Sequence, residues 1–336
     1  MKSLFLLLTI GLLASFAHAQ DTDCGCYSAP TTIASEPITK PVGNKRMLRL
    51  QLQRGQKWKH QMVSHTTSTS ASAPPRDKDG FDGDQKISLA AQSEVVAISP
   101  EGNADVRFVF GDASIALKML YKGKPVRMIQ EIETALQGMA RTLKGRNLVV
   151  TLSPQARVLK VSGTETLTTA LIQSMPARNA FERAYWKEMM PKFVKGLLDD
   201  QKGLLQAVLP LPENAVDTGD SWPASRMSPF VDTETPMTTT YTLLSRGNGE
   251  ARIRVIGTSA STSTKPGQVS PRVILKGTQH GAVRIDETTG WPKSGELFSS
   301  SSSQIVPILN GKPAPDAGST VYNKVVARFS TTPITK

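Results

Sequence analysis

The sequence predicts a mainly β, α+β fold, in which two homologous antiparallel β halves form a curved or barrel-like sheet joined and covered by central helices. Three observations support this prediction. Apolar residues alternate with period two along most of the chain, a helical pattern is confined to its middle, and short motifs occur in the same order in both halves. With 336 residues and an apolar fraction of 39%, the chain is large enough to form a packed core.

The first residues have the pattern of a secretory signal. Residues 1–19 contain a lysine, a short apolar run and the small-residue motif Ala17-His18-Ala19. We therefore expect export to the periplasm or beyond the cell, with cleavage near Ala19. Residues 20–44 form a proline- and threonine-rich lead that we expect to be mobile, and Cys24 and Cys26 within it are expected to be a pair of tail thiols.

The first β half is expected to span residues 45–172. Its strands are separated by a turn at 55–58, a polar loop at 71–86 and a turn at 100–103. The strands are predicted at 48–52, 58–70, 87–98, 104–110, 148–152 and 158–161, and a helix interrupts them at 126–143.

A helical connector is expected over residues 173–209, since apolar residues recur there at spacings of three and four. Pro191 should kink or end the first of its helices. The second β half then covers 210–332, and the serine run Ser299–Ser303 within it is predicted to be a polar loop or a solvated strand. Its strands are predicted at 238–244, 251–256, 273–275, 282–285 and 321–329.

Three motifs indicate an internal duplication. The wider spacing in the first half is accounted for by the polar loop and the first helix. The matched segments are 55–58 and 219–222, 102–107 and 249–254, and 150–153 and 283–286. Trp58 and Trp222 occupy equivalent positions in this alignment, so we expect both to anchor the core. The curved sheets would then enclose either a filled core or a ligand cavity.

The G-x-x-W turn, the strand after Glu101-Gly102-Asn103-Ala104, and the segments 150–163 and 216–222 resemble a family of uncharacterised exported bacterial proteins. Many members of that family are lipoproteins, and it is described as a domain of unknown function. The resemblance covers residues 46–332 and implies an exported, duplicated β protein without known catalytic residues. The family has a glycine in the turn after Ser-Pro, where this chain has Ala156-Arg157. A looser likeness of layout is to periplasmic lipoprotein carriers, whose curved sheet is closed by helices around acyl chains.

The sequence lacks the motifs of common enzyme classes, nucleotide sites and zinc sites, so we predict neither an enzyme nor a cofactor. His60 and His65 differ in parity along a strand and should face opposite sides, as exposed strand histidines. One acidic cluster is a candidate for calcium, although its spacing departs from an EF-hand and it equally fits a solvated loop. Its members are Asp77, Asp79, Asp82 and Asp84.

A basic stretch without intervening acids suits a lipid surface or another anionic envelope component, and it allows peripheral membrane contact. The same residues also fit the outward face of an edge strand. They are Lys40, Lys45, Arg46, Arg49, Arg54, Lys57 and Lys59. Nucleic acid is excluded as a partner by the export signal and the few aromatic residues, and no apolar run is long enough for a transmembrane span.

An adaptable apolar patch on the central helices provides the ligand-lining candidates Trp186, Met189, Met190 and Phe193, although such a patch also suits packing of a helix on a sheet. The leading hypothesis is an exported, non-enzymatic protein that binds an apolar or amphiphilic ligand or an envelope component. The alternatives are a structural or protein-interaction module without a small ligand, and an extracytoplasmic hydrolase.

Overall fold

A computed structural model describes most of the chain. It covers residues 38, 43, 45–72, 80–126, 129–175, 180–197, 208–228, 235–263, 272–306, 308–309, 312–313 and 319–335. The predicted signal at 1–19 lies outside the described residues, as does the lead at 20–44 apart from Ile38 and Gly43.

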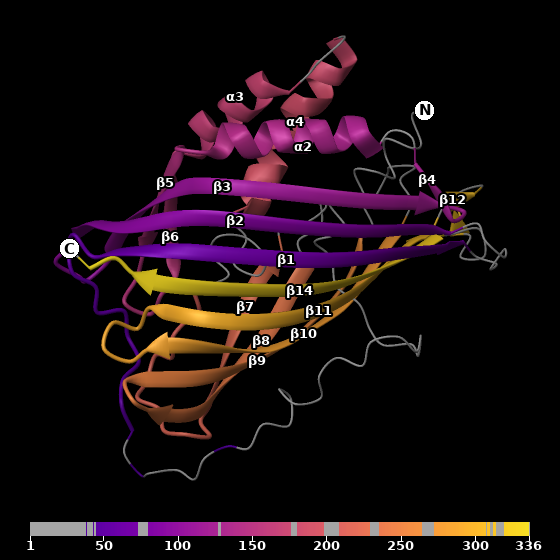
Figure 1. The fold of residues 1–336 in the computed structure, drawn as a ribbon. Coiled ribbons are helices and arrows are strands. Elements are labelled where there is room, and N and C mark those ends of the chain that lie inside the picture. The colour runs from indigo at the N-terminus through magenta and orange to yellow at the C-terminus, as the bar shows by residue number, and fades with distance from the viewer. Residues whose placement is uncertain are drawn as a thin grey trace.

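One large antiparallel sheet of twelve strands dominates the structure. In spatial order the strands are β6 (Val158–Ser162), β5 (Asn147–Leu152), β3 (Ala104–Tyr121), β2 (Phe81–Ile98), β1 (Lys57–Ser72), β14 (Ser319–Pro333), β11 (Pro292–Val306), β10 (Arg272–Asp286), β9 (Glu250–Ser263), β8 (Thr235–Gly247) and β7 (Ser221–Ser228). The short β4 (Lys124–Pro125) pairs with β3, and β12 (Ile308–Leu309) and β13 (Lys312–Pro313) form a separate pair. The sheet curves so that the strands at its β7 end lie behind β1, β2 and β3, which confirms the predicted mainly β, curved architecture (Figure 1).

The order of the strands divides the sheet at β14. On one side of β14, strands β1, β2, β3, β5 and β6 follow one another in chain order. On the other side, β7 to β11 follow in chain order toward β14. Each group is a meander of five strands, and the sheet stays open because β6 and β7 are its two edges.

Three helices lie together beside β3 and β5 (Figure 1). They are α2 (Ile129–Leu143), α3 (Thr164–Ser174) and α4 (Ala180–Leu197). Helix α2 lies along β3 and buries Leu136, Met139 and Leu143. Because β5 pairs only with Ala104–Val109 of β3, the helix covers a part of the strand that would otherwise be an open edge.

Two helical features differ from the prediction. Pro191 neither ends nor interrupts α4. Met190 and Val194 are buried on the two sides of this proline, so packing of both turns offsets the lost hydrogen bond. Helix α3 lies inside the segment predicted as β, and its short apolar face consists of Leu167, Ala170 and Leu171.

The predicted polar loop at 71–86 is also wrong in extent. Strand β1 continues to Ser72 and β2 begins at Phe81, so both strands are longer than their apolar patterns. Likewise β10 is one strand, although two were predicted, because Gly277 and Gly281 interrupt its apolar alternation. A side chain on Gly281 would overlap the backbone of Glu296, which explains why the strand has a glycine there.

The serine run forms part of β11 and is neither a loop nor a solvated strand. Ser299, Ser301 and Ser303 are buried in alternation. Asn323 on β14 donates to the Ser301 hydroxyl (3.4 Å) and accepts from the Ser68 hydroxyl on β1 (2.6 Å). The buried face is therefore polar across this part of the sheet, and hydrogen bonds between side chains satisfy Ser68, Ser301 and Asn323.

The residues predicted as a strand at 48–52 are extended but pair with no strand of the sheet. Leu48 and Leu50 are buried, and the Leu50 amide donates to the Pro154 carbonyl in the β5–β6 turn (2.7 Å). The Gln51 amide donates to the Thr289 carbonyl in the β10–β11 turn (2.9 Å). The segment thus crosses one end of the sheet and joins turns from both meanders.

The turns that precede β1 and β7 have the same hydrogen bonds. Before β1, the Gly55 amide donates to Val95 of β2 (2.8 Å). Before β7, the Gly219 amide donates to Leu243 of β8 (2.8 Å). Both glycines have positive φ, 86° and 94° respectively, and Val95 and Leu243 each lie at a bulge in their ladder.

The tryptophan of each turn follows three residues later. Trp58 and Trp222 are both buried, with 6% and 8% of their surface exposed. Each begins the interior-facing side of its strand, so both contribute to the core as expected.

The β10–β11 turn provides a test of the close approach between that turn and the crossing segment. Gly290 has φ 69°, and an added Cβ would overlap the carbonyl of Arg49. We expect Gly290→Ala to lower the free energy of unfolding by about 3 kcal/mol, because it combines left-handed strain with overpacking. Urea denaturation measures this change. The control is Gly247→Ala, whose Cβ meets no atom within 4 Å and which should change stability by less than about 1 kcal/mol. Equal effects of the two substitutions would contradict the packing described for Gly290.

Candidate functional site: a pocket between the edge strands

A pocket of about 820 Å³ lies between the two edges of the sheet. One side is the end of the β5–β6 turn at 156–158, and the opposite side is the start of β7 at 221–224. The segment between α4 and β7 supplies the rest, with residues 208, 210–214 and 216. The pocket therefore lies where the curved sheet fails to close, and the connecting segment occupies part of the gap.

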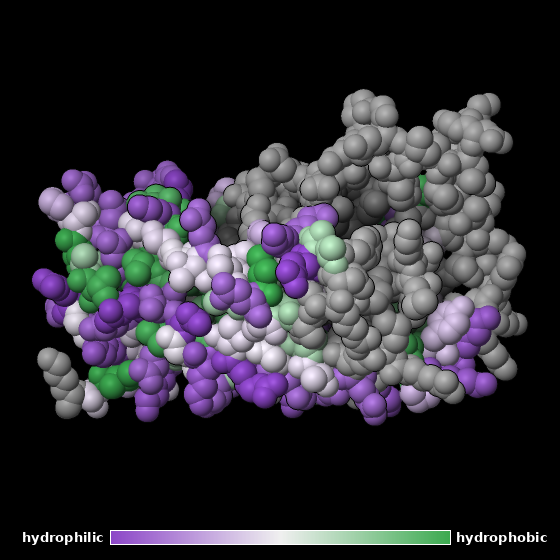
Figure 2. Space-filling view, turned by 90° about the horizontal axis from the view of Figure 1, so that it is seen from above, coloured by the Kyte–Doolittle hydropathy of each residue, from purple (hydrophilic) through white to green (hydrophobic). Residues whose placement is uncertain are grey.

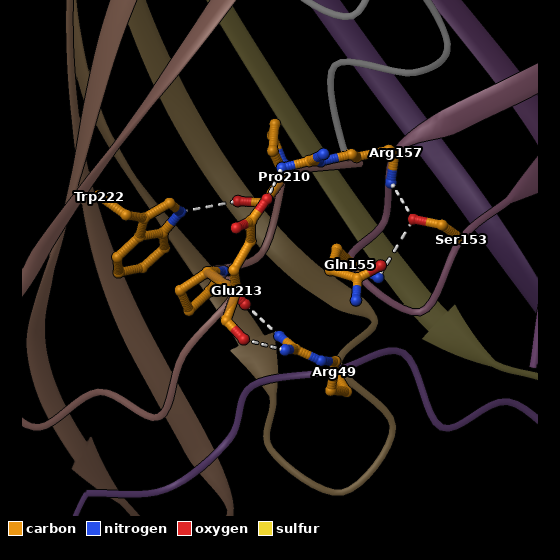
Figure 3. A network of polar contacts seen from close by, with 8 residues as sticks. Arg49, Ser153, Gln155, Arg157, Pro210, Glu213 and Trp222 are labelled. Atoms are coloured by element: carbon orange, nitrogen blue, oxygen red, sulfur yellow. Dashed lines mark hydrogen bonds and ion pairs between the residues drawn. The ribbon is translucent and has the colours of Figure 1, made fainter.

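Trp222 forms one wall of the pocket. Its indole ring stacks on Tyr241 of β8, with centroids 5.9 Å apart and planes inclined by 21°. Its Nε1–H donates to the Pro210 carbonyl (2.9 Å), so the ring fixes the connecting segment to β7 (Figure 3).

The connecting segment is held at both ends by backbone hydrogen bonds. The Leu211 amide donates to the Gln155 carbonyl (2.8 Å), and Val216 exchanges two backbone bonds with Arg46 (3.0 and 3.1 Å). Pro210 and Pro212 flank Leu211 and lack an amide donor, so this stretch cannot continue as a helix or a ladder strand. The wall is thus extended and fixed in place before any ligand arrives.

Charged groups gather at the mouth of the pocket. The guanidinium of Arg157 pairs with the Glu213 carboxylate at 2.6 Å, and both side chains are more than half exposed. The guanidinium of Arg49 donates to the carbonyls of Pro212 and Glu213 (Figure 3). Burial lowers the pKa of Arg49, and the nearby Glu213 carboxylate acts in the opposite direction. Two guanidinium groups thus face one carboxylate.

The β5–β6 end of the molecule also carries hydrophobic surface. Seen from above, hydrophobic residues gather at this end among hydrophilic ones (Figure 2). Val158 and Leu159 of β6 are 41% and 55% exposed, and Val158 lines the pocket. The apolar wall of the pocket therefore continues onto the edge strand.

The structure describes the side chains of two of the four predicted ligand-lining residues, Trp186 and Met190. Met190 is buried in the core and Trp186 packs against that core, while neither lines the pocket. The side chains of Met189 and Phe193 lie outside the described residues. The sequence signal that was overlooked is Pro210-Leu211-Pro212, a rigid apolar stretch eight residues before β7.

The candidate calcium ligands do not meet in the described residues. Asp77 and Asp79 lie outside them, whereas Asp82 and Asp84 are part of β2 and face away from the buried side. Asp84 pairs with His65 at 2.8 Å. The described part of the chain contains no group of three side chains of the types that bind metals.

The basic stretch does not lie on an edge strand, because β1 runs between β2 and β14. The described residues of the stretch have separate roles. Arg49 holds the connecting segment, Lys57 pairs with Glu94 (3.4 Å), and Lys45 pairs with Asp220 (3.1 Å).

His60 is buried, in contrast to the exposed histidine that was predicted, while His65 lies on the opposite face of β1 as expected. The Nε2 atom of His60 contacts the Ser93 hydroxyl (2.6 Å), and the Nδ1 atom of His60 contacts the Thr331 hydroxyl (3.3 Å). The ring also lies near Phe108 and Trp291. Burial lowers the pKa of His60 to about 4, so the imidazole is neutral at neutral pH.

The buried imidazole makes stability depend on pH. Its pKa is lower in the folded protein than the value of 6.5 expected in the unfolded chain, so its contribution is complete above pH 6.5 and is lost as the pH falls toward 4. We expect the destabilisation caused by His60→Gln to shrink by about 3 kcal/mol between pH 7 and pH 4. Urea denaturation of both proteins across this range measures the difference. If the destabilisation caused by His60→Gln does not change with pH, the imidazole of His60 is solvated in the folded protein.

None of the helices in the described part of the chain is long and apolar enough to cross a membrane. Comparison with solved structures gives low similarity. A structure of lipid–protein interactions in lipovitellin has a TM-score of 0.46 at 9% identity, covering 83% of this chain and 25% of the other. An outer membrane channel from Pseudomonas putida F1 has a TM-score of 0.24 at 9% identity, covering 88% and 100%. The chain thus spans a quarter of the length of the lipovitellin chain.

No curated protein matches the sequence. Residues 101–292 match a protein family described as a family of unknown function (DUF6263). The match runs from the turn before β3 to the start of β11, and so includes strands of both meanders, all three helices and every segment that lines the pocket. Since the matched residues are more than half of the chain, this protein belongs to the DUF6263 family.

Proposed function

We propose that this protein is an exported, non-enzymatic binding protein that holds an apolar or amphiphilic ligand in the pocket between β6 and β7. The observation that carries the proposal is the pocket itself. Its volume of about 820 Å³ lies in the range of small-molecule sites.

The chemistry of the walls supports an amphiphilic ligand. Val158, Val208, Leu211 and Trp222 provide apolar surface, and the charged groups lie at the mouth. A ligand with an apolar body and one polar end fits this arrangement, because its body leaves water while its polar end stays hydrated.

The fixed walls also support binding. The bonds of Trp222 to Pro210 and of Leu211 to Gln155 hold the pocket open without a ligand. A site that needs no ordering on binding retains more of its interaction energy as affinity.

His60 is not available as the catalytic base that the alternative of a hydrolase would need. Its ring nitrogens contact hydroxyl groups inside the core, and burial keeps it neutral and away from the pocket walls. A structural or interaction module remains the other alternative, and it requires that nothing small enters the pocket.

Export and duplication are parts of the same proposal. The apolar run before Ala17-His18-Ala19 supports export and cleavage near Ala19. The equal hydrogen bonds around Gly55 and Gly219, and the five-strand order on each side of β14, support an origin by duplication.

Filling the pocket should abolish binding. We expect native mass spectrometry of the mature protein, purified from the envelope fraction of cells, to show an added mass in the wild type that is lost in Ala224→Phe. Ala224 lines the pocket, and a benzyl group there occupies space that the ligand needs.

The matched control is Ala116→Phe on β3, which is exposed and outside the pocket, and which should keep the added mass. A wild-type protein that carries no ligand, and takes up none from an extract of envelope lipids, would overturn the proposal in favour of a structural module. Loss of the added mass in the control as well would place the ligand elsewhere.

A further inference from the structure

The turn that borders the pocket has a counterpart in the other meander. In the β5–β6 turn, the Ser153 amide donates to the Arg157 carbonyl (2.9 Å), and the Ala156 amide donates to the Ser153 carbonyl (2.8 Å). Ala156 has φ 58°, which is the left-handed region. The Ser153 hydroxyl also accepts from the amides of Gln155 and Arg157 (both 3.2 Å), which fixes the turn.

The β10–β11 turn is one residue longer, but it is closed by two corresponding backbone bonds and has different side chains. The Asp286 amide donates to the Trp291 carbonyl (2.8 Å), and the Gly290 amide donates to the Asp286 carbonyl (2.8 Å). Gly290 has φ 69°, and the Asp286 carboxylate accepts from the amides that follow it. Arg157 therefore holds the position in its turn that Trp291 holds in the other.

Trp291 has a stacking partner at that position. Its ring lies on Trp58, with centroids 4.7 Å apart and planes inclined by 19°. Both rings are buried, so an indole fills the space between β1 and the β10–β11 turn.

The equivalent pair at the edges of the sheet is Trp222 and Arg157. Trp222 is the second residue of β7, as Trp58 is of β1, and the turns before the two strands have the same hydrogen bonds. Both Trp222 and Arg157 line the pocket. Tyr241 of β8 stacks on Trp222, and the pocket lies on the side of Trp222 that corresponds to the place of Trp291 beside Trp58.

We infer that the ligand has a planar ring that lies against Trp222, in the place that corresponds to Trp291, and an acidic group that pairs with Arg157. This inference rests on the proposed function and specifies its ligand class. Stacking of a flat ring on an indole is favourable beyond the burial of its area.

The charges at the mouth determine the sign of the polar group. Arg157 and Glu213 line the pocket with one charge of each sign, and the guanidinium of Arg49, which bonds to the carbonyls of Pro212 and Glu213, adds a second positive charge behind them. An anionic group on the ligand can pair with Arg157 in place of the Glu213 carboxylate, whereas a cationic group is repelled by the two guanidinium groups.

Three probes with the same number of carbon atoms separate the features of the ligand. They are naphthalene-2-carboxylate, which is flat and anionic, undecanoate, which is flexible and anionic, and 2-naphthylmethylamine, which is flat and cationic. Isothermal titration of the mature protein should give an affinity for naphthalene-2-carboxylate about tenfold higher than for undecanoate. The affinity for naphthalene-2-carboxylate should also be about fivefold higher than the affinity for 2-naphthylmethylamine.

Two variants test the position of the ring. Ala156→Gly combined with Arg157→Trp reproduces the Gly290-Trp291 pair, so its indole should stack on Trp222, abolish binding of all three probes and raise the Tm. Arg157→Gln keeps the pocket open, and it should reduce the preference for the carboxylate over the amine about threefold.

The outcomes distinguish this inference from the proposed function. Equal affinities for naphthalene-2-carboxylate and undecanoate would overturn the planar ring and leave a binding protein for flexible amphiphiles. Binding of none of the probes, together with the absence of a co-purified ligand, would overturn both. A double variant that binds naphthalene-2-carboxylate as the wild type does would show that the ring does not occupy the position of Trp291.

Discussion

The two open edges of the sheet are the constraint on which the rest of the structure depends. A curved sheet with free edges exposes backbone groups and leaves its apolar concave face uncovered. The chain covers part of this gap with the segment between α4 and β7, which bonds to the β5–β6 turn through Leu211 and to Arg46 through Val216. The described part of this segment, residues 208–220, pairs only through the bridge between Val216 and Arg46 and forms no longer ladder, and the pocket lies beside it.

Much of the fold could be predicted from local patterns in the sequence. Alternation identified the strands whose inner residues are apolar, such as the one that contains Val106 and Phe108, and the glycine turns located several hairpins. The strand segments that were missed in β10 and β11 have one physical cause. Where the concave face is polar, as at Ser299–Ser303, or interrupted by Gly277 and Gly281, alternation of hydrophobicity disappears although the strand continues.

The candidate site could be predicted less well, since its walls come from segments far apart in the chain. The apolar patch around Met190 was a reasonable ligand surface, but such a patch serves equally well for packing, and the core uses it in that way. The pocket instead depends on how the turn at Ala156 and the strand at Trp222 approach each other across the gap, which no local pattern encodes. The local signs were the Pro210-Leu211-Pro212 stretch and the residues Ala156-Arg157 in the turn after Ser-Pro, both of which the structure places at the pocket wall.

The β5–β6 and β10–β11 turns differ in how much their residues contribute to stability. With glycine and tryptophan, the β10–β11 turn avoids left-handed strain and fills its neighbouring space with a stacked indole. With alanine and arginine, the β5–β6 turn accepts strain of about 1 kcal/mol at Ala156 and gives up burial of a large ring, which stabilises a core by about 3 kcal/mol. The strain at Ala156 and the lack of a large buried ring at Arg157 both occur at the pocket wall, where they leave the pocket unfilled. Local losses of stability that coincide at one pocket are typical of functional sites, because selection for a bound ligand maintains what selection for stability alone would remove.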